Sequence, residues 1–239
     1  MTTIPTGVAR VFGATARGMV LDAAAGVCRG IEYVADRKAG RSRALSTLRV
    51  RALILSDDRG TPLAVPDQLS AAFDRADRIF TDAAGLRVRL VGVDVVTEPA
   101  PVEVLDPRSN RRLLLDHIRG RTEFFRRELA PRPLLSIVGD PVTVVVVRNI
   151  AGTVTGCSLG MTADWVLAQA SLFEAANPRG YDETVLAHEL GHALNLPHVR
   201  DQANLMNPVS TPPNAVRGTS LRPWQAAIVA ANRHVIPPA

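Results

Sequence analysis

The chain has 239 residues, of which 46% are apolar, 21% charged and 4% aromatic, and this composition excludes collagen-like, low-complexity and largely disordered proteins. Residues 1–48 carry seven basic and three acidic side chains, so +4 of the net charge of +5 lies in this segment. The rest of the chain lacks the concentrated basic stripe of a nucleic-acid-binding domain, and no nucleic-acid partner is expected.

Residues 1–46 form the first predicted unit, a basic N-terminal arm. Apolar residues recur at helical spacing between Val11 and Val34, which predicts a helix. Several roles stay open for it: a helix packed on the main domain, a pro-segment, a targeting or packaging element with its own delivery partner, or a membrane-surface helix. Cys28 has apolar neighbours at this spacing and is expected to be a buried core thiol, although a disulfide with Cys157 is also left open.

Neither a membrane span nor a signal peptide is expected in this arm. No apolar run approaches the roughly 18 residues that a transmembrane segment needs. Arg10 and Arg17 interrupt the one stretch that could form the apolar part of a signal peptide. We therefore expect a cytoplasmic protein, or one that is exported by a route independent of a signal peptide.

Residues 47–239 form the second predicted unit, in which strand and helix patterns alternate. Strands are expected at about Leu48–Ser56, Leu86–Glu98, Val142–Arg148, Val154–Leu159 and Trp165–Ser171. Helices bounded by proline and glycine are expected at about Pro66–Ala84, Arg111–Leu129 and Leu221–Arg233. This order predicts an α+β (mixed α/β) fold in which helices pack on a twisted sheet.

The stretch TVLAHELGHALNLPH, residues 184–198, is the part of the sequence that indicates chemistry. His188 and His192 lie four residues apart, so on a helix they share one face and can present two imidazole nitrogens to one metal ion. Glu189 points to a neighbouring part of the surface, where its carboxylate can contact a water at the metal without being a ligand. This pattern predicts a helix that carries a metal site.

A third histidine completes the site if the helix ends in time. His198 comes six residues after His192, about 9 Å further along a straight helix at 1.5 Å per residue. Asn195 and Pro197 supply the necessary break, because asparagine readily adopts the left-handed conformation that ends a helix and proline cannot continue one. The three histidines then leave a fourth position for water, which is the arrangement of one catalytic zinc ion.

Together, the motif His188-Glu189-x-x-His192-x-x-Asn195-x-x-His198 resembles the extended zinc motif of the metzincin metallopeptidases, with Asn195 where that family has glycine. A His-Glu-x-x-His pattern arises by chance in about three or four of a thousand such chains, and a third histidine at a fixed position lowers this to the order of one in ten thousand.

A second resemblance follows the motif. The sequence Asn204-Leu205-Met206-Asn207-Pro208 is similar to the Met-turn of the same family, a tight turn whose methionine lies beneath the metal. Met206 comes eight residues after His198, a spacing like that of the matrixins. The resemblance implies a zincin-like fold with an antiparallel edge strand, an active-site helix, the Met-turn and a C-terminal helix.

The function that this resemblance implies is a zinc-dependent endopeptidase acting on a protein or peptide substrate. Glu189 would be the general base and His188, His192 and His198 the zinc ligands. The edge strand would bind an extended peptide through Val154, Thr155, Gly156, Cys157 and Ser158. The chain after the Met-turn, with Pro208, Val209 and Ser210, would bound an apolar pocket for the residue that follows the cleaved bond. Calcium is not indicated, since the sequence has no convincing aspartate-rich loop.

Two other functions stay open. A protease toxin or effector delivered by a dedicated export system would account for a complete protease without a signal peptide, with the basic arm as its loading segment. A catalytically silent metzincin-fold binding protein would keep the fold without turnover. The intact set of His188, Glu189, His192 and His198 argues against the silent protein.

Overall fold

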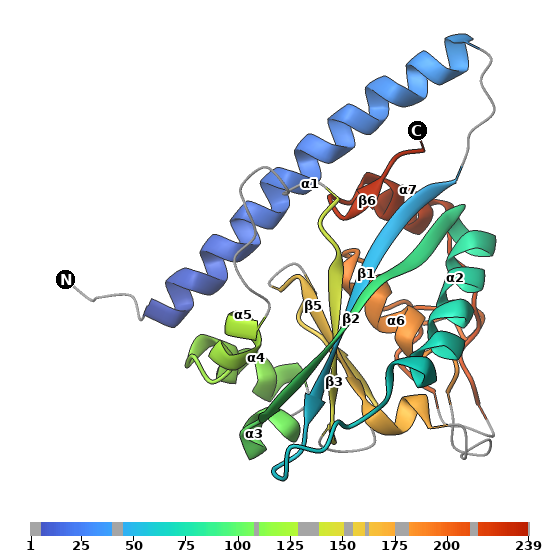
Figure 1. Cartoon of the computed structure of the whole chain (residues 1–239). Coiled ribbons are helices and arrows are strands. Elements are labelled where there is room, and N and C mark those ends of the chain that lie inside the picture. Colours follow the sequence, from blue (N-terminus) through green and yellow to red (C-terminus); the bar gives the residue numbers. More distant parts are fainter. Residues whose placement is uncertain are drawn as a thin grey trace.

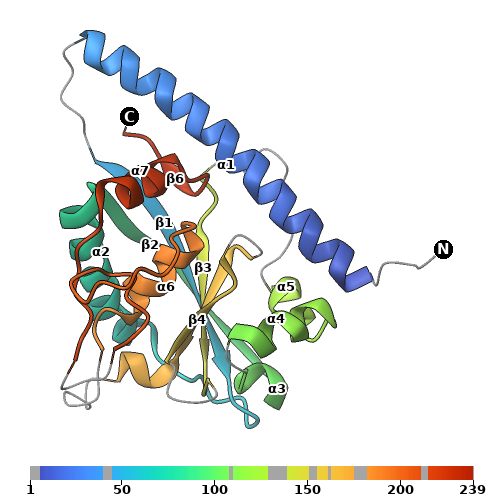
Figure 2. The same ribbon diagram turned by 180° about the vertical axis from the view of Figure 1, so that it is seen from behind.

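A computed structural model of the chain describes residues 6–39, 45–107, 110–128, 139–150, 155–160, 163–174, 182–210 and 215–238. In this part of the chain a sheet lies at the centre and helices lie on both of its faces. The long helix α1 (Thr6–Ala39) crosses the outside of the body (Figures 1 and 2). The mixed α/β fold expected from the sequence is confirmed.

The sheet is mostly parallel. Its strands are β1 (Ser46–Ser56), β2 (Leu86–Pro99), β3 (Val142–Val147), β4 (Gly156–Ser158), β5 (Trp165–Gln169) and β6 (Val235–Ile236). Their order is β2-β1-β3-β5-β4, and β6 pairs with the start of β1. The first four strands of this order are parallel, whereas β4 runs antiparallel to β5 at the end of the sheet. The expected antiparallel edge strand is therefore confirmed, while Val154 lies outside the described residues.

The helices form one layer on each face of the sheet. One layer holds α2 (Ser70–Ala84), α6 (Val185–Ala193) and α7 (Pro223–Ala231), and the other holds α3 (Val102–Leu105), α4 (Asn110–Ile118) and α5 (Glu123–Glu128). Two short 3-10 helices, η1 (Pro66–Leu69) and η4 (Ala170–Phe173), precede α2 and follow β5. Figures 1 and 2 show the two layers from opposite sides.

Two apolar cores hold these layers together, because the side chains of a strand alternate between its two faces. On β1, Ala52 and Ile54 belong to the core under α2 and α6, whereas Leu53 and Leu55 belong to the core under α3, α4 and α5. Strand β3 is buried at every position, as its continuous run of valine and threonine predicts. The sheet thus gives the α6 layer a rigid support.

Some expected element boundaries are wrong. The helix expected at Arg111–Leu129 is divided, because Gly120 has a φ of 79°, a left-handed conformation that separates α4 from α5. The strand expected at Trp165–Ser171 ends at Gln169, where η4 begins. By contrast, Gly85 ends α2 as expected, with a φ of 62°.

Small residues of α1 pack against the body. Gly18 and Ala25 are buried, and a methyl group added to Gly26 would lie 3.7 Å from Ala231 Cβ of α7. Cys28 is exposed on this helix, so the expectation of a buried core thiol is wrong. Cys157 is the buried cysteine, and both residues are thiols rather than a disulfide.

One stretch of α1 has the length and composition of a membrane-crossing helix. Gly7–Arg29 comprises 23 residues with a mean hydropathy of 1.3, and 11% of its most apolar window is buried. Signal sequences and core helices have similar averages, so the absence of a transmembrane segment stays a prediction.

Candidate metal centre

Helix α6 carries His188, Glu189 and His192. It begins after Thr184, whose backbone amide donates a hydrogen bond to Asp182 Oδ1 at 2.9 Å. The remaining positions of α6 are alanine, leucine, valine and glycine, and they are buried against the sheet and α2. The helix thus holds three polar residues within an apolar layer.

Asn195 ends this helix and turns the chain back. Its φ is 68°, and it is the one non-glycine residue with a positive φ in the described part of the chain. The Asn195 amide donates to the His192 carbonyl, and the Leu196 amide donates to the Gly191 carbonyl, both at 2.9 Å. Such bonds satisfy the free carbonyls at a helix end. The left-handed turn expected at Asn195 is confirmed, and it brings His198 back toward α6.

The ring nitrogens of the three histidines converge on one point. Nε2 of His192 lies 3.2 Å from Nε2 of His188 and 3.0 Å from Nε2 of His198. Zinc–nitrogen bonds of about 2.0–2.1 Å in tetrahedral geometry place neighbouring nitrogens about 3.3 Å apart. The spacing therefore fits one metal ion held by three histidines.

Backbone carbonyls fix the protonation of two of these rings. Nδ1 of His188 lies 2.8 Å from the Leu205 carbonyl, and Nδ1 of His192 lies 2.9 Å from the Leu196 carbonyl. Because a carbonyl only accepts hydrogen bonds, each Nδ1 carries the proton and each Nε2 presents a lone pair. Lone pairs that face one another at this distance repel, and a cation between them removes the repulsion. The donor set therefore fits a metal ion.

Burial keeps the same rings neutral. It lowers the pKa of His188 to about 2 and that of His192 to about 4, and it also lowers the pKa of His198. The positive charge of Arg217 acts in the same direction on all three pKa values. Neutral imidazole is the form that binds a metal, so the rings need no proton release at neutral pH.

A tight turn at residues 204–207 lies against α6 and orients one of the three histidines. Met206 is fully buried, and a methyl group added to Gly191 would lie 2.6 Å from its Sδ atom. Asn204 shapes the turn, because its Oδ1 accepts a hydrogen bond from the Met206 amide at 2.9 Å. The Asn204 and Gln225 amide groups exchange hydrogen bonds of 2.7 and 3.2 Å, which fasten the turn to α7. The same turn supplies the carbonyl that anchors His188.

Glu189 is buried beside the three histidines, where β4 packs on it. A methyl group added to Gly156 would lie 2.6 Å from Glu189 Cγ and 3.0 Å from its Oε1. Glu189 Oε2 has no hydrogen-bond partner among the described residues. Burial raises the pKa of Glu189 to about 8, with the charge of Arg217 acting against it. This carboxyl group is therefore placed to accept and hold a proton.

The structure brings part of the expected edge-strand segment next to Glu189. Gly156 contacts it directly, Thr155 is half-buried just before β4, and Ser158 is buried at the end of that strand. The side chain of Cys157 belongs to the core on the opposite face, under α3, α4 and α5. Only the backbone of Cys157 could therefore take part in strand addition, and peptide binding by this strand stays a prediction. Burial, and secondarily the Glu189 charge, raises the pKa of this thiol.

The other expected substrate-binding segment follows the 204–207 turn. Pro208 and Val209 are exposed and Ser210 is half-buried. Asn207 Oδ1 accepts a hydrogen bond from the Val209 amide at 2.9 Å, so the segment continues directly from the turn. Pro208 and Val209 are therefore open to a ligand.

The sequence did not predict an ion pair at the start of α6. Arg217 Nη2 lies 3.2 Å from Asp182 Oδ2, and the two side chains are 9% and 6% exposed. Arg217 Nη1 has no hydrogen-bond partner in the described part of the chain. The two residues are 35 positions apart and share no pattern, so the sequence offers no signal for the pair.

The sequence also did not predict a contact between α1 and the turn at Asn195. Asp22 Oδ2 accepts a hydrogen bond from Asn195 Nδ2 at 2.7 Å. The same oxygen lies 3.0 Å from Nη1 of the buried Arg233, whose amide donates to Asp22 Oδ1 at 2.9 Å. Asn195 thus ends α6 through its backbone and binds α1 through its side chain, which a glycine could not do.

No protein-family model and no curated protein matches the sequence. Metalloproteinase-II from Bacteroides fragilis is similar in structure, with a TM-score of 0.49 and 14% identity over 81% of this chain and 55% of that chain. The chain thus spans about half the length of that protein. Archaemetzincin from Methanopyrus kandleri gives a TM-score of 0.44 and 17% identity over 77% of this chain and 93% of that chain. A zinc-dependent peptidase from Methanocorpusculum labreanum gives a TM-score of 0.37 and 14% identity over 75% of this chain and 99% of that chain.

Proposed function

We propose that the protein is a zinc-dependent endopeptidase of the metzincin type. The convergence of three Nε2 atoms, two of them on rings whose proton is fixed on Nδ1, carries the proposal. The metzincin subtype is supported by the left-handed Asn195 and by the buried Met206 next to the helix of the motif.

The chain's own residues account for the proton transfers of peptide hydrolysis. His188, His192 and His198 would hold the zinc ion. Zinc would act as a Lewis acid that activates a water and polarises the scissile carbonyl. Glu189 accepts the proton of the attacking water and returns it to the leaving amine. The raised pKa of Glu189 makes its ionised carboxylate a stronger proton acceptor, and Oε2, which has no hydrogen-bond partner among the described residues, can receive the proton.

The position of β4 supports a protein or peptide substrate. An extended peptide can add to the end of a sheet through backbone hydrogen bonds. A peptide along β4 would pass the general base, because Gly156 of this strand contacts Glu189. We assign the backbone of Thr155–Ser158 to this role, and Pro208, Val209 and Ser210 to the pocket for the residue after the cleaved bond.

Cleavage of casein, an unstructured protein, tests the proposal. We expect the purified chain to cut casein, a zinc chelator to stop the cleavage, and added zinc to restore it. Mass spectrometry of the fragments identifies the residue after each cut, which we expect to be apolar because Pro208 and Val209 carry no charge. Cleavage that persists in excess chelator would contradict the proposal, and a charged preference would contradict the assigned pocket.

Gly156→Ala tests the contact between β4 and the general base. The new methyl group would displace the Glu189 side chain. We therefore expect kcat to fall about tenfold or more while the zinc content stays unchanged, since a small displacement of a catalytic group costs about that much. Gly92→Ala on β2 is the matched control, because a methyl group there meets nothing within 4 Å. Equal activity of both variants would contradict the role of this contact.

A further inference from the structure

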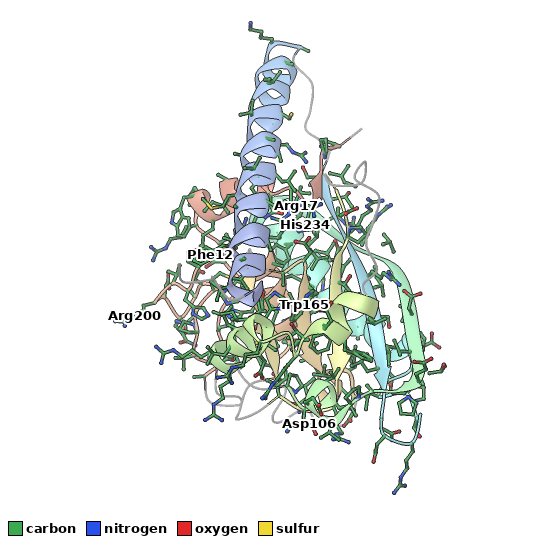
Figure 3. The ribbon with its side chains drawn as sticks, turned by 90° about the vertical axis from the view of Figure 1, so that its left-hand side faces the viewer. Phe12, Arg17, Asp106, Trp165, Arg200 and His234 are labelled. Carbon is green, nitrogen blue, oxygen red and sulfur yellow. The ribbon has the colours of Figure 1, made fainter. Side chains whose placement is uncertain are left out.

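The outer side of α1 exposes five large apolar residues of the helix. Between 57% and 70% of each of these residues is exposed: Phe12, Met19, Val20, Val27 and Ile31. In Figure 3, which faces the left-hand side of Figure 1, α1 lies in front of the body and Phe12 lies at its surface. A helix of a water-soluble domain ordinarily turns such residues toward the core. Their exposure requires an explanation.

These side chains form one continuous stripe. Met19 lies seven residues after Phe12, Val27 lies seven after Val20, and Ile31 lies four after Val27, spacings that keep residues on one side of a helix. Among the described side chains between residues 9 and 35, which leave out 10, 30 and 32–34, the other exposed positions are alanine, glycine and Cys28, apart from Arg17. In the described side chains the stripe thus carries little charge over about six turns of helix, given 3.6 residues per turn.

The inner side of the same helix is docked through specific contacts. Gly18 and Ala25 are buried there, and Asp22 binds Asn195 and Arg233. Arg29 adds a hydrogen bond from its guanidinium to the Val235 carbonyl. Because polar contacts fix the inner side, a rotation that buried the apolar stripe would break them. The stripe therefore faces outward in the docked helix.

Charge distinguishes the occupants that could cover this stripe. Among the described side chains of α1, the exposed charged residues are Arg17 and Lys38, which are both positive. Residues 1–48 as a whole carry a net charge of +4. A second copy would bring an equal positive charge against this one. An anionic lipid surface would bring the complementary charge, worth about 1 kcal/mol for each basic residue near it. The charge therefore favours a bilayer.

Asp22 distinguishes a helix on the bilayer surface from one that crosses it. The membrane-length stretch Gly7–Arg29 has Asp22 inside it. A crossing helix would lose the contacts of Asp22 with Asn195 and Arg233 and place a carboxylate in hydrocarbon, which costs several kcal/mol. A helix that stays docked buries its stripe in the lipid interface and keeps these contacts.

We propose that the outward stripe of α1 binds the surface of an anionic phospholipid bilayer, with the helix lying in the membrane plane and the body of the protein mounted on it. The stripe is defined by Phe12, Met19, Val20, Val27 and Ile31. This proposal does not depend on peptidase activity. The apolar stripe would contact the lipid interface, and the positive charge of residues 1–48 would attract the negative lipid headgroups.

Vesicle flotation of the full chain tests this proposal. We expect the protein to float with vesicles of phosphatidylcholine mixed with phosphatidylglycerol, and to float less with phosphatidylcholine alone or at high salt. The triple variant Phe12→Ser, Val20→Ser, Val27→Ser should bind the anionic vesicles at least about tenfold more weakly, because it removes much of the apolar area. The control variant Val65→Ser, Val91→Ser, Val102→Ser removes exposed apolar residues of the body and should bind like the wild type.

Three results would overturn the proposal. The first is a wild-type chain that does not bind anionic vesicles, or that binds neutral ones equally well. The second is a dimer in light scattering that the triple variant at Phe12, Val20 and Val27 abolishes, which would make a second copy the occupant. The third is bound protein that alkaline carbonate does not extract, which would make α1 a crossing helix. Melting temperatures of all variants establish that each is folded.

Discussion

Glu189→Gln is expected to retain zinc and to lower kcat/KM for a casein peptide by about a hundred- to ten-thousand-fold, the usual contribution of a general base. Glutamine has nearly the same shape as glutamate but cannot accept the proton of the attacking water. Zinc retention is expected because the three Nε2 atoms that converge belong to His188, His192 and His198 and not to Glu189. The measurement is a kinetic assay on protein whose zinc content has been determined by mass spectrometry.

A matched control separates this effect from the loss of a charge. Glu183→Gln makes the same chemical change just before α6, at an exposed residue whose partner is the half-buried Arg75. We expect its activity to equal that of the wild type. A Glu189→Gln enzyme that remains as active as the wild type would exclude Glu189 as the general base.

Metal-free protein offers a second readout of the same residue. Burial raises the folded-state pKa of Glu189 from 4.5 to about 8. The contribution of this group to stability is therefore fully present below pH 4.5 and is lost as the pH rises toward 8. Glu189→Gln should remove that pH dependence from the free energy of unfolding. An unchanged slope between these pH values would contradict the buried setting of the carboxyl group.

Asn195→Ala is expected to weaken zinc binding about tenfold or more. Alanine in the left-handed conformation costs about 1–2 kcal/mol, and about 1.4 kcal/mol corresponds to a factor of ten in affinity. The cost falls on the turn that carries His198 back to the other ligands. Competition with a chromophoric chelator measures the zinc Kd.

Asn195→Gly is the informative partner of that substitution. Glycine adopts the positive φ freely but loses the hydrogen bond to Asp22, so its zinc Kd should change only a few-fold. Asp22→Ala removes the same hydrogen bond and also the contacts with Arg233, so it should destabilise the docking of α1 but change the zinc Kd no more than Asn195→Gly does. If the alanine and glycine variants bound zinc equally well, the left-handed turn would not be what positions His198.

The clustering of the three histidines was predictable because its determinants are local. His188, His192 and His198 lie within eleven consecutive residues, and one helix turn plus one left-handed residue fixes their relative positions. Strands β1, β2 and β3 were predictable for a similar reason, since each strand's own sequence shows either alternating apolar and polar residues or a continuous apolar run. The positions of the outer helices depend on more distant partners.

What the sequence could not predict depends on contacts between distant segments. Helical periodicity in α1 locates an apolar side but not the side that faces the body, and small residues at Gly18 and Ala25 together with Asp22 decided the docking. The wrong expectation of a buried Cys28 thiol has this cause. The ion pair of Arg217 with Asp182 likewise joins segments that no spacing rule connects.

The zinc content of the purified full-length chain tests the central claim most directly. The convergence of His188, His192 and His198 predicts one zinc per chain, and His198→Ala should lower the occupancy strongly when zinc is limiting. Glu189→Gln should keep one zinc per chain in the same measurement. A wild-type protein that stays free of zinc after incubation with the metal would contradict the account.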